Sequence, residues 1–140
     1  MAVCDYVEPS PMGTRWGLGG TCVNVGCIPK KLMHHAGVLG QQLRDAQAYG
    51  WSNPAQADLN WSKLVENVQN HILNMNFSYR SALMDESIKY YNARARFDNA
   101  STVVAVDKKG KEHIIKAKNI VLAVGGVLFT LTYLVQKSIV

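Results

Sequence analysis

Cysteine is scarce in this sequence, and its distribution excludes the disulfide framework of a small secreted protein. The 140 residues include three cysteines, an odd number, with Cys22 and Cys27 close together and Cys4 apart from both. Met1 to Pro11 contain two acidic residues and no apolar run behind a basic start, so no secretory signal is apparent. These absences favour a reducing compartment. We expect a cytoplasmic location and leave a mitochondrial one open.

The sequence also lacks an apolar run long enough for a membrane helix. The stretch from Ile120 to Val135 has 16 residues and is interrupted by Gly125-Gly126, whereas a spanning helix needs about 20 apolar residues. A buried strand followed by another element explains this stretch better. We therefore expect no association with a membrane.

Basic charge is present but is not concentrated. The net charge is +5, and the basic residues form only short clusters at Lys30-Lys31 and from Lys108 to Lys111. Aromatic residues do not alternate with them, as they do in proteins that bind single-stranded nucleic acids, so we expect no nucleic-acid partner. The proportions of 48% hydrophobic and 18% charged residues are those of a globular domain.

Two helices are predicted from apolar spacing. The first begins near Ile28 and ends near Ala46, with Pro29 in its first turn and Gly50 after its end. The second runs from Trp61 to about Leu83, with Asp58 or Asn60 as its N-cap.

Short strands are predicted on either side of these helices. They are Val3–Val7, Ile88–Tyr91, Ala95–Phe97, Thr102–Val106, His113–Lys116 and Ile120–Val124. The polar segment from Asp107 to Gly110 should turn a hairpin. One strand, two helices and then several strands predict an α/β domain whose opening elements are missing or supplied elsewhere.

The segment from Gly19 to Lys31, GGTCVNVGCIPKK, carries the chemical signal. On a regular helix, cysteines five residues apart would have Cα atoms roughly 8 to 9 Å apart, beyond the range of about 4.4 to 6.8 Å that a disulfide tolerates. A bridge between Cys22 and Cys27 therefore needs an irregular turn, which Gly26 permits. Pro29 then restarts the helix and leaves Cys27 near its N-terminus, where the helix dipole favours a thiolate.

The residues alone leave three interpretations of the two cysteines. A zinc half-site lacks a second Cys or His pair at ligand spacing. Two inert core thiols and a redox-active disulfide remain about equally well supported, although the flanking Gly-Gly-Thr and Pro-Lys-Lys suit the redox pair better.

The run GTCVNVGCIPKK, from Gly20 to Lys31, resembles the redox-active signature of the glutathione reductase superfamily. Within it, the motifs GTRWGL before the cysteines, LMH after them, YGW from Tyr49 and VQNHI from Val68 resemble the large, animal-type thioredoxin reductases. The resemblance covers about Val3 to Gly126. Glutathione-disulfide reductase is the alternative.

This resemblance implies a partial FAD-binding, Rossmann-like domain that passes electrons from NADPH through FAD to the Cys22–Cys27 disulfide and on to thioredoxin. Cys27 would face the flavin, Cys22 would exchange with the next disulfide, and Lys30 would lie near the flavin ring. The remaining residues expected to bind the cofactor are Asp5, Tyr6, Gly20, Thr21, Gly26, Arg94, Ala95, Val124 and Gly125. The full-length form would be a homodimer serving cell redox homeostasis.

The sequence also departs from this family. A Gly-x-Gly-x-x-Gly turn and its strand are absent, and residues 127–140 form an apolar tail with no family likeness, so we expect a partial domain at 1–126. These 140 residues should then bind FAD weakly or not at all and show no NADPH-dependent turnover. A non-catalytic, truncated product is thus a further alternative. Whether the complete form carries Cys or selenocysteine at its C-terminus is left undecided.

Overall fold

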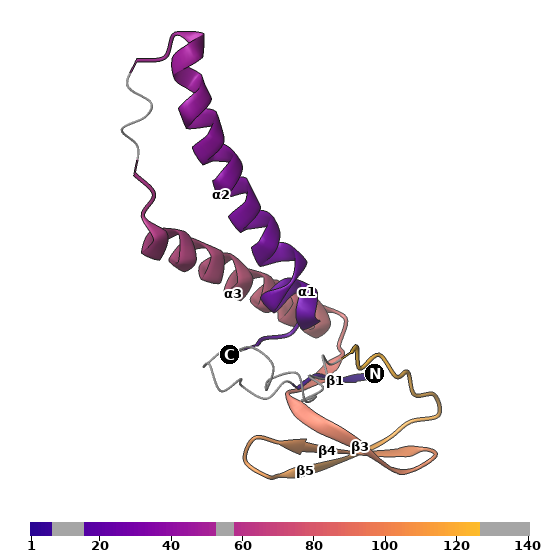
Figure 1. Cartoon of the computed structure of the whole chain (residues 1–140). Coiled ribbons are helices and arrows are strands. Elements are labelled where there is room, and N and C mark those ends of the chain that lie inside the picture. The colour runs from indigo at the N-terminus through magenta and orange to yellow at the C-terminus, as the bar shows by residue number, and fades with distance from the viewer. Residues whose placement is uncertain (7–15, 53–57, 127–140) are drawn as a thin grey trace, which may run out of the picture.

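A computed structural model of the chain describes residues 1–6, 16–52 and 58–126. Figure 1 shows the helices on one side, the larger sheet on the other and the first strand between them. In chain order the elements are β1 (Ala2–Cys4), α1 (Gly20–Val25), α2 (Cys27–Ala46), the short 3-10 helix η1 (Gln47–Tyr49), α3 (Trp61–Asp85), β2 (Lys89–Tyr91), β3 (Ala93–Asn99), β4 (Thr102–Asp107) and β5 (Glu112–Lys116).

The strands form two small sheets. β1 pairs in parallel with β2, with Cys4 opposite Tyr91, and β3, β4 and β5 form an antiparallel meander. β4 is the central strand of the meander and holds its core, because Val104 and Ala105 are both buried. The parallel pair joined through helices, together with the meander, gives the expected α/β fold of a partial Rossmann-like domain.

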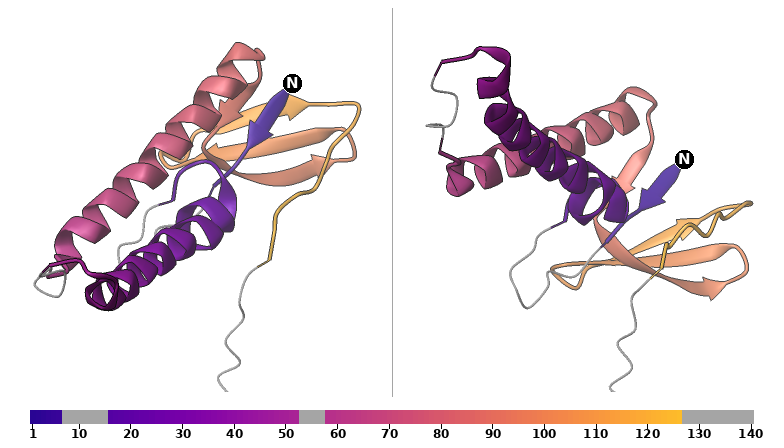
Figure 2. Two further views of the ribbon diagram at one scale, coloured as in Figure 1. Left: turned by 90° about the horizontal axis from the view of Figure 1, so that it is seen from above. Right: turned by 45° about the horizontal axis from the view of Figure 1, so that its top comes forward.

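The helices pack around α1. α1 contacts both α2 and α3, and Asn76 of α3 bonds to Asn24 of α1. Val23 of α1 and Val68 and Ile72 of α3 are buried. α2 starts at this junction, and its far end points away from α3 (Figures 1 and 2). Leu39 and Leu43, which belong to the predicted apolar face of α2, are therefore exposed.

The predicted helix ends are largely confirmed. Asn60 is the N-cap of α3, and its side-chain oxygen accepts a hydrogen bond of 2.9 Å from the peptide N–H of Lys63. Gly50 ends η1 in the left-handed conformation, at φ 87°, which favours glycine. Both helices extend to within two residues of the bounds read from apolar spacing.

Two strand predictions need correction. The first strand is shorter than Val3–Val7: it ends at Cys4, and Val7 lies outside the described residues. Ile120–Val124 is not a strand; Val121 and Val124 are 88% and 89% exposed. This run has the apolar composition of a strand, but no described strand pairs with its backbone, and a strand needs such a partner for its hydrogen bonds.

The predicted hairpin at Asp107–Gly110 is present. Gly110 donates its N–H to the carbonyl oxygen of Asp107 over 2.9 Å, with φ 78° at the glycine. Of the helices in the described ranges, none is both long and apolar enough to cross a membrane.

Candidate redox disulfide site

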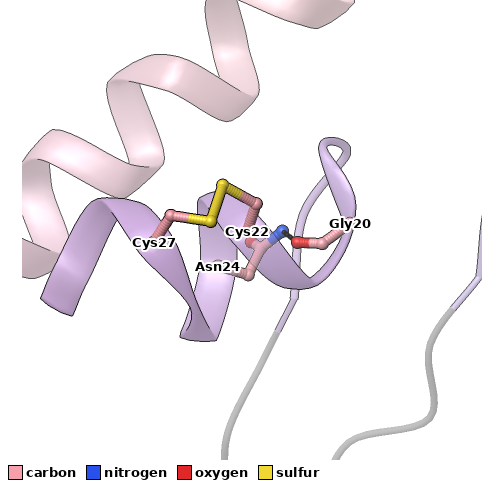
Figure 3. The surroundings of a disulfide bond; sticks show 4 residues. All are labelled: Gly20, Cys22, Asn24 and Cys27. Atoms are coloured by element: carbon pink, nitrogen blue, oxygen red, sulfur yellow. Dashed lines mark hydrogen bonds between the residues drawn. A yellow bond between two sulfur atoms is a disulfide. The ribbon is translucent and has the colours of Figure 1, made fainter. Parts of the chain in front are cut away.

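The break between α1 and α2 brings the two cysteines together. α1 ends at Val25, α2 begins at Cys27, and Gly26 between them has φ −118° and ψ −118°, outside the helical region. Cys22 and Cys27 form a disulfide with their Cα atoms 4.7 Å apart (Figure 3). This confirms the expectation that an irregular turn places the two sulfurs within bridging distance.

Gly26 is required at the break by the closeness of the backbone around it. A Cβ at this position would lie 2.9 Å from the carbonyl oxygen of Thr21 and 3.0 Å from the Cα of Cys22. Neither atom belongs to a flexible side chain that could turn away. The missing side chain therefore lets the start of α2 fold back onto the first turn of α1.

Cys27 occupies the first position of a helix of 20 residues. The regular hydrogen bonding of α2 starts beyond it, where the N–H of Lys30 bonds to the carbonyl oxygen of Gly26 over 3.1 Å. The positive end of the helix dipole and the free N–H groups of the first turn favour negative charge there. A thiolate at Cys27 would meet this environment when the disulfide is reduced.

The residues that form and flank the disulfide are exposed. Cys22, Cys27, Thr21 and Lys30 are all exposed, and a Cβ on Gly20 would meet no atom within 4 Å. Two cysteines buried as inert core thiols would not have this exposure. The site is thus accessible to a redox partner or to a planar ring.

Two asparagines beneath the disulfide were not predicted as site residues. Asn24 is 7% exposed, and its side-chain amide bonds to the backbone of Gly17 and Gly20. The side chain of Asn76 on α3 donates to Asn24 and to the carbonyl oxygen of Leu18. The bond from Asn24 to Gly20 is drawn in Figure 3. A sequence signal existed for Asn24, a polar residue between two valines, but none pointed to Asn76.

Other predicted residues lie at the end of β1. Asp5 follows this strand, and its N–H donates to the carbonyl oxygen of Tyr91 over 3.1 Å. Tyr6 is half-buried, with the ammonium group of Lys108 located 5.8 Å from its ring centre. Burial raises the pKa of Tyr90, the charge of Asp5 adds to this rise, and Arg80 partly offsets it.

The remaining predicted residues are dispersed. Arg94 and Ala95 lie on β3, opposite Val106 and Ala105 of β4. Val124 and Gly125 belong to an exposed, irregular segment after the meander. The structure thus brings together the residues around the disulfide, places Asp5 and Tyr6 at one strand end, and leaves Val124 and Gly125 apart from both.

The third cysteine has a different character. Cys4 lies in β1 as a free thiol, and burial raises its pKa. A raised pKa keeps the thiol protonated and therefore a poor nucleophile. Within residues 1–6, 16–52 and 58–126, no three His, Cys, Asp or Glu residues are grouped as metal ligands would be.

Comparison with known proteins agrees with this geometry. The family model of pyridine nucleotide-disulphide oxidoreductases matches residues 8–134. The chain belongs to the pyridine nucleotide-disulphide oxidoreductase family. Its members are redox proteins that use a flavin and a nicotinamide cofactor, which favours the redox interpretation of Cys22 and Cys27 over inert thiols.

One relative indicates which members of this oxidoreductase family the chain resembles. The chain is 59% identical over 126 residues to the protein named thioredoxin reductase SEP1 of Emiliania huxleyi. The match covers 90% of this chain and 25% of the relative, so the chain spans about a quarter of the length of that protein. The likeness to thioredoxin reductases inferred from the motifs is thereby confirmed.

Proposed function

We propose that this chain is the disulfide-bearing part of the FAD domain of an NADPH-dependent thioredoxin-disulfide reductase. The observation that carries the proposal is the exposed Cys22–Cys27 disulfide at the start of α2. The similarity to a protein named thioredoxin reductase supports thioredoxin as the final acceptor. The function served would be cell redox homeostasis.

The two cysteines have different roles in this proposal. Cys27 faces the flavin, because a thiolate at the first position of α2 is stabilised by the helix dipole. Cys22 is the exchanging thiol, because it lies on the separate helix α1 and not at the start of the longer helix α2. The attack of the Cys22 thiolate on an incoming disulfide forms a mixed disulfide, which Cys27 then resolves.

The residues around the disulfide fit a flavin. The exposed cysteines and the side-chain-free surface of Gly20 leave room for a planar ring, and the exposed Lys30 offers it a positive charge. A bound FAD, once reduced by NADPH, would supply the two electrons that open the disulfide. Thr21 and Gly26 lie in the same short segment, where the main chain can approach a cofactor closely.

The adenosine half of FAD would be held at a distance from the sulfurs. Asp5 follows a parallel strand, the position from which an acidic residue bonds a ribose in dinucleotide-binding folds. Tyr6 is adjacent to it, and we retain Arg94 and Ala95 of β3, together with Val124 and Gly125, as proposed contacts. A cytoplasmic homodimer is the setting that the family resemblance implies for the full-length form.

A chimera tests this function. Residues of this chain would replace the matching quarter of the Emiliania huxleyi relative, and NADPH oxidation would be followed with thioredoxin or glutathione disulfide as acceptor. We expect turnover with thioredoxin and loss of that turnover in Cys22→Ser and Cys27→Ser. The flavin absorbance of each purified protein confirms that FAD is bound.

Two results would refute the proposal. A flavin-loaded chimera that reduces glutathione disulfide in preference to thioredoxin would favour the alternative reductase. If the flavin-loaded chimera kept its thioredoxin turnover in both serine variants, Cys22 and Cys27 would take no part in the reaction.

A further inference from the structure

Two asparagine side chains join three segments of the chain beneath the disulfide. Asn24 lies in α1 between the two cysteines, and Asn76 lies near the middle of α3. The third segment runs from Gly17 to Gly20 and leads directly into α1. Among the predicted site residues, Gly20 takes part in this network, through its carbonyl oxygen.

The network uses both ends of the Asn24 amide. Its Oδ1 accepts from the N–H of Gly17 at 2.9 Å and from Nδ2 of Asn76 at 3.2 Å. Its Nδ2 donates to the carbonyl oxygens of Gly17 at 3.1 Å and Gly20 at 2.8 Å. An aspartate at this position would keep the accepting oxygen and lose both donated bonds.

Asn76 connects this unit to the long helix. Its Nδ2 also donates to the carbonyl oxygen of Leu18 at 2.8 Å. A Cβ on Gly17 would collide with the Asn76 side chain. Val68 and Ile72 of α3 are buried in the core. The hydrogen bond from Asn76 to Leu18 therefore holds the segment before α1 against a helix that is itself fixed in the core.

We propose that Asn24 and Asn76 are positioning residues for the Cys22–Cys27 couple. They fix α1 relative to α3, with which α2 is also in contact, and thereby hold Cys22 beside Cys27 after the disulfide has opened. This proposal rests on the proposed function, because it assumes that the pair is oxidised and reduced in turn.

The physical consequence is a shift in the redox equilibrium. Glutathione disulfide takes two electrons from the two thiols, which releases two glutathione thiols and closes the Cys22–Cys27 bond. Closure is more favourable when the thiols are already held together, because less conformational freedom is lost. Loss of the network frees α1 in the dithiol and should favour reduction.

The test measures this equilibrium in the 140-residue chain. Asn76→Asp removes the donor of two hydrogen bonds without changing the size of the side chain. We expect its oxidation constant with glutathione to fall about tenfold, which corresponds to about 30 mV. Asn24→Asp should shift the constant in the same direction, whereas Asn70→Asp, an equal change at an exposed position of α3, should leave it unaltered.

Constants within about twofold of the parent in folded Asn76→Asp and Asn24→Asp would overturn the positioning role. A parent whose thiols never reach equilibrium with glutathione would instead overturn the proposed redox function. The two failures are therefore distinguishable.

A second measurement needs no substitution in the network. Coupling between the network and the disulfide is reciprocal. Reduction of the disulfide in the parent must therefore weaken the network by the factor by which loss of the network lowers the oxidation constant. Hydrogen exchange at the N–H of Gly17, which bonds to Asn24, should accelerate about tenfold on reduction. Unchanged exchange would overturn the proposal even where a variant fails to fold.

Discussion

Substitution of Gly26 by alanine tests the structural basis of the disulfide most directly. The added Cβ would lie 2.9 Å from the carbonyl oxygen of Thr21 and 3.0 Å from the Cα of Cys22, closer than such contacts allow. Both are backbone atoms, so the turn must open to relieve the contact. Overpacking of this kind costs about 1 to 3 kcal/mol.

The strain should act on the oxidised state in particular. The Cα atoms of Cys22 and Cys27 are 4.7 Å apart, near the lower end of the range that a disulfide accepts, and the crowding at Gly26 arises within the same turn. If about 1.4 kcal/mol of the cost falls on the closed form alone, the oxidation constant with glutathione falls tenfold. Titration in glutathione buffers, with free thiols counted after acid quenching, measures this constant.

Gly37→Ala is the matched control. Gly37 lies inside α2, and a Cβ there meets no atom within 4 Å. Alanine should stabilise the chain by about 0.5 to 1 kcal/mol in urea unfolding, because it restricts the unfolded state more than glycine does. If Gly26→Ala left both the oxidation constant and the stability as in the parent, the close approach would not be a requirement for the bridge.

Four further outcomes are expected. At neutral pH, iodoacetamide should alkylate Cys27 in Cys22→Ser faster than Cys22 in Cys27→Ser, because the helix dipole favours the Cys27 thiolate; equal rates would contradict this. Asn60→Ala should lower the free energy of unfolding in urea by about 1 kcal/mol through loss of the α3 cap, and an unchanged midpoint would exclude that role for the cap. The backbone N–H groups of Lys109 and Lys111 donate to Asp107 and hold the pKa of its carboxyl below the usual value. The carboxylate therefore stabilises the fold fully above about pH 4, and this stabilisation is lost as the pH falls through the lower pKa of the folded state. Acid unfolding of Asp107→Asn should lack this component, and acid unfolding curves identical to those of the parent would contradict it. The 140 residues alone should show only background NADPH oxidation with added FAD, and a rate abolished by Cys22→Ser would contradict this.

Much of the fold could be predicted because its signals are local. The spacing of apolar residues defined α2 and α3, Asn60 marked the start of α3, and Gly50 marked the end of η1. The hairpin at Asp107–Gly110 also depends on neighbouring residues only. Such patterns act within a few residues, and a sequence displays them directly.

What could not be predicted depends on distant partners. Ile120–Val124 has the composition of a strand, yet a strand forms only where another backbone pairs with it. The bond between Asn76 and Asn24 joins residues 52 positions apart, and nothing in the residues around Asn76 indicates it. The disulfide was predictable because both of its cysteines belong to one short motif.

The parallel pairing of β1 with β2 has a consequence for the order of folding. Ala2 pairs with Lys89, so this contact closes a loop that contains every helix of the described chain. Closing so long a loop costs more conformational entropy than forming the β3–β5 meander, whose strands follow one another directly. The meander and the α1–α2 turn can therefore form before β1 docks. Oxidation of Cys22 and Cys27, only five residues apart, then does not require the β1–β2 pairing to be in place.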